Sequence, residues 1–209
     1  MTDSMRKIVP DKSEDSVNLQ IWYNSLLKTK LKSSSCEYQI LEHMGPSGHG
    51  EIFLAITNDH FLVGIKIIMN KDNMENELAY LRNINKKIQD VFLPFLDYFI
   101  IQNQDEKYYA IVSKFFEGYV SLKSYLDKNL FHVEQLEKLK ITISDHIQHL
   151  HDKVGCVHND IGNHNILIHS KTLHIRIFDL GYCIPKFGFT EEEFGKLVHK
   201  DFSAIKKIQ

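Results

Sequence analysis

The sequence predicts an α+β protein with two lobes: a small antiparallel β lobe that carries one helix, and a reduced, mainly helical second lobe. In the first half, short apolar runs separated by turns follow the order β-β-β-α-β-β. In the second half, residues 132–152 show the apolar spacing of a long helix. The length of 209 residues suits one domain built of two small lobes. We expect an N-terminal extension at 1–36, a first lobe at 37–116 and a second lobe at 117–209.

Composition and charge exclude several classes of protein. The formal net charge of −2 argues against a chain that mainly coats nucleic acid or an anionic membrane, so we expect neither as a partner. Three cysteines without a CxxC pair exclude a disulfide framework and a zinc ribbon. The first residues lack the apolar core of a signal peptide, and no apolar run is long enough to span a bilayer. These features predict a reducing, cytoplasmic location.

The N-terminal extension divides into three parts. Residues 1–16 are polar and without periodicity, which predicts a frayed tail. Residues 17–31 predict a short helix docked on the main domain, because Val17, Ile21, Trp22 and Leu26 recur at roughly helical spacing. The serine-rich run before Cys36 predicts a linker.

The first lobe is expected to be a meander, a helix and a hairpin. Apolar runs at 38–44, 52–56 and 61–69 are separated by turn residues, which predicts three antiparallel strands. Two further runs, 95–101 and 108–114, flank a polar tip and predict a hairpin. Between them, the predicted helix 74–88 carries one apolar face, formed by Leu78, Leu81, Ile84 and Ile88.

The second lobe is expected to be mostly helical. The long helix 132–152 carries one apolar face, formed by Leu136, Leu139, Ile143, Ile147 and Leu150. The other expected elements are a short helix at 121–130, short strands at 166–168 and 173–177, a solvated acidic helix start at 191–193, and a helix from Lys200.

Two signals in the first lobe have the chemistry of a phosphate site. Glycines in the turn 45–50, which also contains Ser47, would let backbone N–H groups approach a polyphosphate; a plain glycine-rich hairpin turn is the alternative. Lys66 lies in an otherwise apolar strand, where an ammonium group needs a partner. Glu77, eleven residues on in the helix, is the natural partner, and an edge lysine that reaches water is the alternative.

Two signals in the second lobe have the chemistry of proton transfer and metal binding. A polar loop between apolar segments holds Asp160 and Asn165, which can orient a nucleophile and bind a cation; capping residues in a turn are the alternative. Asp179 follows an apolar strand and precedes Leu180-Gly181, which suits a metal-binding carboxylate; an Asp-x-Gly turn is the alternative.

Together, in this order, the four signals resemble the protein kinase superfamily from Glu37 to about Asp201. The resemblance implies ATP and Mg²⁺ as cofactors and a protein as substrate. It gives Asp160 the role of catalytic base, makes Lys66 and Glu77 the catalytic ion pair, with Glu75 as the alternative acid, and makes Asn165 and Asp179 the metal ligands. It assigns nucleotide binding to Gly45, Ser47, Gly48, Gly50, Ile52 and Lys66, and Asp201 to bracing the catalytic loop.

The motifs depart from the family pattern at several positions. Ser47 replaces the middle glycine of the loop, and Leu180 replaces Phe in D-F-G. Asn159 replaces the Arg of H-R-D, so activation by phosphorylation of the activation loop is not expected, because no guanidinium is present to bind the phosphate. Gly162 stands where many Ser/Thr kinases carry Lys, which removes one positive charge near the transferring phosphate.

The second lobe is expected to be truncated, because only 28 residues follow Gly181. The resulting apolar surface predicts a cover, either the segment 17–31 of the same chain or a protein partner. Two functions remain open. The first is an ATP- and magnesium-dependent kinase, with a Ser/Thr protein acceptor ahead of a small-molecule acceptor. The second is a binding module that resembles a kinase and docks on a true kinase or its substrate.

Overall fold

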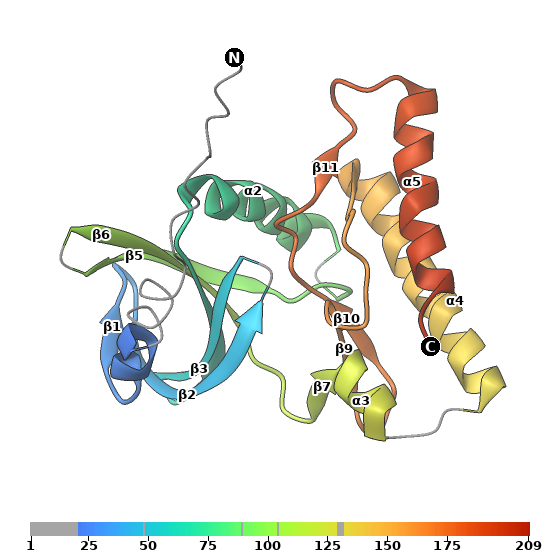
Figure 1. Ribbon diagram of the computed structural model, residues 1–209. Coiled ribbons are helices and arrows are strands. Elements are labelled where there is room, and N and C mark those ends of the chain that lie inside the picture. The colour runs from blue at the N-terminus through green and yellow to red at the C-terminus, as the bar shows by residue number, and fades with distance from the viewer. Residues whose placement is uncertain (1–20, 48, 89, 104, 129–131) are drawn as a thin grey trace, which may run out of the picture.

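The computed structural model describes residues 21–209 except 48, 89, 104 and 129–131, and it contains two lobes (Figure 1). The first lobe is a six-stranded antiparallel sheet in the order β1-β2-β3-β4-β6-β5. Its strands are β1 Lys30–Lys32, β2 Glu37–Ser47, β3 Gly50–Thr57, β4 Leu62–Ile68, β5 Phe95–Asn103 and β6 Glu106–Lys114. The predicted β-β-β-α-β-β order is confirmed, and β1 is an additional strand that sequence analysis assigned to the extension.

Helix α2 (Lys71–Lys87) lies against one side of this sheet (Figure 1). The side chain of Asn70 caps its N-terminus by accepting hydrogen bonds from the backbone N–H groups of Asp72 and Asn73. The helix therefore begins three residues before the expected start. Its buried face is the predicted one, with Leu78, Leu81 and Ile84 in the core, so the helix is held at a fixed angle beside the cleft.

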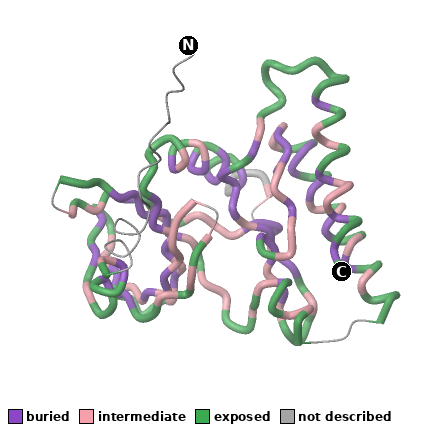
Figure 2. Tube along the Cα trace, viewed as in Figure 1, coloured by how far each residue is buried: buried purple, intermediate pink, exposed green. Residues whose placement is uncertain are grey.

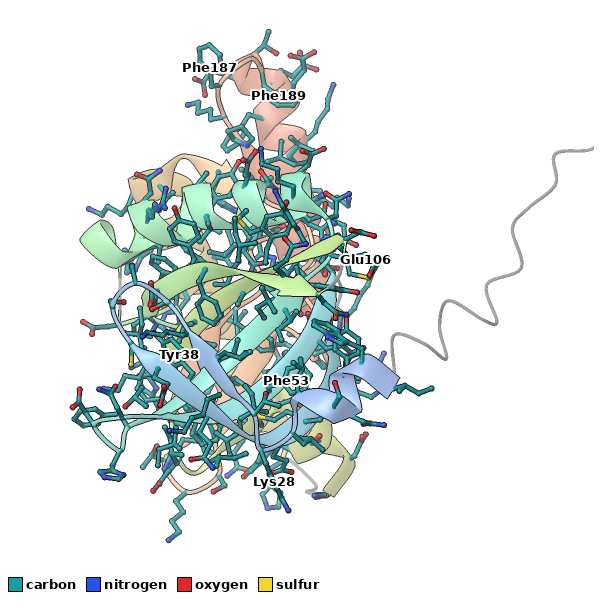
Figure 3. All side chains as sticks on the ribbon, turned by 90° about the vertical axis from the view of Figure 1, so that its left-hand side faces the viewer. Lys28, Tyr38, Phe53, Glu106, Phe187 and Phe189 are labelled. Atoms are coloured by element: carbon teal, nitrogen blue, oxygen red, sulfur yellow. The ribbon has the colours of Figure 1, made fainter. Side chains whose placement is uncertain are left out.

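Residues 21–26, which are the described helical part of the N-terminal segment, pack on the β lobe and not on the second lobe. Residues 21–26 are helical, with Tyr23 and Leu26 buried among the side chains of the sheet. The Trp22 ring stacks on Tyr108 of β6 at a centroid distance of 3.9 Å. Figure 3 shows this helical turn beside the strand that carries Phe53. The hypothesis that this segment covers the second lobe is therefore wrong for residues 21–26, and Val17 lies outside the described residues.

The serine-rich run is a bound turn and not a free linker. The hydroxyl groups of Ser33, Ser35 and Tyr38 all donate to one carboxylate oxygen of Asp97, at 2.6, 2.8 and 2.8 Å. Lys30–Lys32 then pairs with the start of β2. Residues 21–36 thus form part of the first lobe in this structure.

The second lobe combines helices with five short strands in two small sheets. Its helices are α3 Leu122–Lys128, α4 Val133–His149 and α5 Glu191–Lys206, and a π-helical turn, Leu150–Val154, extends α4. Strands β7 Tyr119–Ser121, β9 Ile166–His169 and β10 Ile175–Ile177 form one sheet, and β8 Cys156–Val157 pairs with β11 Ile184–Pro185. Helices α4 and α5 lie side by side (Figure 1). The two-lobed α+β prediction is confirmed.

Helix α5 begins nine residues before the expected start at Lys200. Thr190 accepts a hydrogen bond from the backbone N–H of Glu193, and the Glu193 side chain accepts one from the backbone N–H of Thr190. This reciprocal capping box starts the helix at the acidic run, so the two features expected separately are one helix. Its inner face buries Phe194, Asp201 and Ile205.

The buried apolar side chains form two clusters, and Figure 2 shows where buried residues occur along the chain. One fills the β lobe under residues 21–26. The other joins α2 to α4, α5 and the short strands, so α2 belongs to the packing of both lobes. Within the described residues, no helix is long and apolar enough to cross a membrane.

Candidate functional site

A buried ion triad lies between the two lobes. The Lys66 ammonium on β4 is 2.8 Å from a carboxylate oxygen of Glu77 on α2 and 2.7 Å from one of Asp179 in the second lobe. The alternative acid, Glu75, lies at the surface and pairs with Lys71. Because β4 places Lys66 opposite Ile52 of β3, the ammonium projects from beneath the glycine-rich turn.

The electrostatics of this triad leave a surplus of negative charge. Burial alone would lower the pKa of Lys66, but Glu77 and Asp179 outweigh it and raise that pKa. Burial raises the pKa of Glu77, whereas the adjacent ammonium overcomes burial at Asp179 and lowers its pKa. Two carboxylates thus share one cation, and this arrangement favours the arrival of a further positive charge.

Helix α2 and the segment after Asp179 are tied together by neutral side chains. The amide of Asn76 donates to the carbonyl oxygen of Gly181 at 2.6 Å. From the glycine-rich turn, His49 hydrogen-bonds with Asn73 at 3.1 Å and lies against Tyr182 with ring centroids 4.2 Å apart. These bonds hold Glu77 and Asp179 on either side of Lys66 without a phosphate group.

The polar loop brings Asp160 and Asn165 together. The Asn165 side-chain amide donates to both the backbone carbonyl and a carboxylate oxygen of Asp160, each at 2.8 Å. Its nitrogen is thereby engaged, which leaves the amide oxygen as the atom available to a cation. The Asp160 carboxylate remains partly exposed, as a group that exchanges a proton with a substrate must be.

Asp201 of α5 supports this loop from beneath. Its carboxylate accepts hydrogen bonds from the backbone N–H groups of His158 and Asn159 at 2.9 and 2.8 Å, and it contacts His151 at 2.9 Å. Asn159 adopts a left-handed backbone conformation, with φ of 64°. Burial lowers the pKa of His158, whose neutral ring donates from Nε2 to the carbonyl oxygen of Phe178. The loop is thus connected to the residue that precedes Asp179.

The cleft beside these groups has a volume of about 570 Å³. Ser47, Ile52, Lys66, Asn165 and Asp179 all line it. Gly45 has a φ of 112°, and a Cβ on Gly50 would lie 2.0 Å from the carbonyl oxygen of Ile67, so both positions require glycine. Gly48 lies outside the described residues.

Sequence reasoning missed four residues that the structure places at this site. His49, Asn76, His151 and His164 contact residues that carry the motifs. His49 lies at the tip of the glycine-rich turn, Asn76 immediately precedes Glu77, and His164 immediately precedes Asn165. Position next to a motif residue was the only signal available, and it does not reveal a contact between distant segments.

A glycine-rich turn over a cleft, a buried Lys–Glu–Asp triad and an adjacent Asp–Asn loop define a protein-kinase-like fold. The model of the protein kinase domain family matches residues 38–186, which is more than half of the chain. The chain belongs to this family.

Two known proteins illustrate the likeness. The chain is 25% identical over 136 residues to calcium/calmodulin-dependent protein kinase type II of Schizosaccharomyces pombe, which covers 63% of this chain and 26% of that protein. The crystal structure of the BubR1 kinase domain superposes with a TM-score of 0.65 at 14% identity, covering 85% of this chain and 60% of that one. The chain therefore spans about a quarter of its curated relative.

The residues present fit ATP and a magnesium ion. Mg²⁺ prefers oxygen ligands, one or two carboxylates together with substrate phosphates. Asp179 and the Asn165 amide oxygen provide such a set, and the surplus negative charge of the triad favours it. Lys66 and the glycine-rich turn supply cationic and N–H donors for phosphate oxygens.

Proposed function

We propose that this kinase-family domain transfers the γ-phosphoryl group of ATP to a hydroxyl group of a protein serine or threonine. The observation that carries the proposal is the triad, in which Lys66 contacts Glu77 and Asp179 at once. A family member that had lost phosphoryl transfer would have no chemical need for this arrangement together with Asp160 and Asn165.

Each residue has a distinct role in the proposed reaction. Lys66 holds the α- and β-phosphate oxygens, and Glu77 keeps the ammonium in place. Asp179 and Asn165 would hold Mg²⁺, which neutralises charge that develops on the phosphate oxygens.

Asp160 orients the acceptor. Its carboxylate accepts the proton of the acceptor hydroxyl, the hydroxyl oxygen forms a bond to the γ-phosphorus, and the bond from that phosphorus to the β–γ bridging oxygen breaks. ADP leaves with the electron pair of that bond. Positioning and charge neutralisation provide most of the acceleration in this chemistry.

The second candidate function is a binding module that retains the fold and docks on a kinase or a kinase substrate. The departures at Ser47, Asn159 and Gly162 favour it, because each removes a feature that active kinases commonly carry. A small-molecule acceptor is a variant of the first proposal and needs the same residues.

Incubation with γ-labelled ATP, Mg²⁺ and a cell lysate tests the proposal, with Asp179→Asn as the matched control. We expect labelled protein with the wild type and none above background with Asp179→Asn, because the variant loses a metal ligand. A wild type that binds ATP and Mg²⁺ but labels nothing in the lysate would favour the binding module. The same result with the variant and the wild type would contradict the assigned role of Asp179.

A further inference from the structure

Lysine side chains gather around the cleft. Four lysines line the cleft, of which Lys66 alone has carboxylate partners among the lining residues, Glu77 and Asp179. The other three, Lys114, Lys123 and Lys128, are exposed at its mouth. Within the described residues, no ion pair involves these three. The mouth therefore carries net positive charge although the chain as a whole has a formal charge of −2.

Two of these lysines lie on a helix that is hydrogen-bonded to the loop that carries Asp160 and Asn165. Lys123 and Lys128 lie on α3, and the backbone N–H of Lys123 donates to the carbonyl oxygen of Asn163 at 2.9 Å. That bond fixes α3 against the loop between Asp160 and Asn165. Asp127 lies on the same helix but, unlike the two lysines, does not line the cleft.

His164 adds a polar donor directly beside the catalytic carboxylate. Its Nε2 is 3.6 Å from a carboxylate oxygen of Asp160, and the ring lines the cleft. A Cβ on Gly162 would lie 2.7 Å from this ring. The absence of a side chain at Gly162 therefore leaves room for the imidazole of His164, which occupies that space.

From this geometry we propose that His164, Lys123 and Lys128 form a subsite for an acidic peptide, in which Asp or Glu side chains flank the acceptor hydroxyl. The physical reason is that Asp160 repels an acidic substrate unless cations lie beside it. Lysine ammonium groups and an imidazole N–H on the same side supply that compensation. The inference rests on the proposed function and names its substrate class.

Equilibrium binding of two peptides tests the subsite without requiring turnover. Both are fluorescein-labelled and share one central serine; Asp and Glu flank it in one peptide, and Lys and Arg flank it in the other. Fluorescence anisotropy is measured with the full chain, Mg²⁺ and a non-hydrolysable ATP analogue. We expect the wild type to bind the acidic peptide about tenfold more tightly, with a preference that weakens as salt is added, since several partly screened charge pairs contribute.

The variants separate a local subsite from overall charge. Lys123→Glu/Lys128→Glu should lower acidic-peptide affinity about tenfold or more, because two attractions become repulsions. The control Lys107→Glu/Lys138→Glu changes the net charge equally at exposed positions outside the cleft lining and should leave the affinity nearly unchanged. His164→Ala should weaken acidic-peptide binding without altering the melting temperature.

The melting temperature of the same samples, measured with and without the ATP analogue and Mg²⁺, distinguishes a failure of the proposed function from a failure of the subsite. Without a wild-type shift, the proposed function fails. With a shift, stronger binding of the basic peptide, equal binding of both, or no measurable binding of the acidic one would overturn the subsite. An equal loss in the control double variant would also overturn it, because the effect would then follow net charge alone.

Discussion

Two buried carboxylate clusters lie on either side of the loop that carries Asp160 and Asn165, and they differ in how their charge is satisfied. At the cleft, Glu77 and Asp179 compete for the single ammonium of Lys66. Beneath the loop, Asp201 has two backbone N–H donors and His151 to itself. The first cluster holds negative charge that a cation or a substrate can use, whereas the second is complete without a ligand. Burial of an acid therefore does not by itself identify a functional group.

The largest expected effect is a loss of stability on replacing Asp201, in the cluster beneath the loop. Asp201→Ala leaves the N–H groups of His158 and Asn159 and the ring of His151 without their buried acceptor. Each unsatisfied buried donor costs about 1–3 kcal/mol, so we expect a loss of roughly 3 kcal/mol or more in the free energy of unfolding. Urea denaturation measures it, with the exposed Asp152→Ala as the control. A loss below about 1 kcal/mol would mean that Asp201 does not brace the loop.

The second-largest effect is expected at Lys66, in the cluster at the cleft, and the quantity that changes is the rate of phosphoryl transfer. Lys66→Met should lower phosphoryl transfer at least about 100-fold, in the range found when one transition-state donor is removed. The fold should survive, because burial already raises the pKa of Glu77 and its neutral form tolerates the loss of the ammonium. Initial rates and circular dichroism measure the two quantities, with the exposed Lys107→Met as the control. Transfer at the wild-type rate would remove Lys66 from the mechanism.

A smaller effect is expected at Asp97, whose partly exposed carboxylate accepts hydrogen bonds from uncharged donors. Burial alone would raise its pKa, but hydrogen bonds from Ser33, Ser35 and Tyr38 outweigh burial and lower it. A lowered folded-state pKa contributes stability that is present above the unfolded value near 3.8 and is lost as the pH falls through the folded value. The melting-temperature advantage of the wild type over Asp97→Asn should therefore shrink on acidification below that value. An advantage that grows on acidification would reverse the assigned direction.

Sequence reasoning reached the parts of the fold that local patterns determine. The apolar face of α2 and the strand order of the first lobe follow from periodicity, and the candidate site residues follow from motifs with fixed spacing. Lys66 and Glu77 were paired from sequence because an ammonium in an apolar strand needs a partner within reach.

The parts that sequence reasoning missed depend on contacts between distant segments. Nothing near Trp22 indicates that its ring stacks on Tyr108, so the helical turn was assigned to the wrong lobe. The contact of His49 with Asn73 and Tyr182 joins three separate elements. The helix start expected at 191–193 is the start of α5, whose Thr190–Glu193 capping box is local, but its continuity with the helix expected from Lys200 was missed.

We propose that the cleft cluster of Lys66, Glu77 and Asp179 holds a nucleotide together with Mg²⁺. The most direct measurement is the melting temperature of the full chain with ATP and Mg²⁺ together, with each alone, and with Asp179→Asn as the variant. A ligand that binds only the folded state stabilises it by an amount that grows with ligand concentration over Kd. We expect a concentration-dependent rise for the wild type that is largest with both ligands and mostly lost in Asp179→Asn. No rise with ATP and Mg²⁺ at saturating concentration, or an equal rise in the variant, would contradict it.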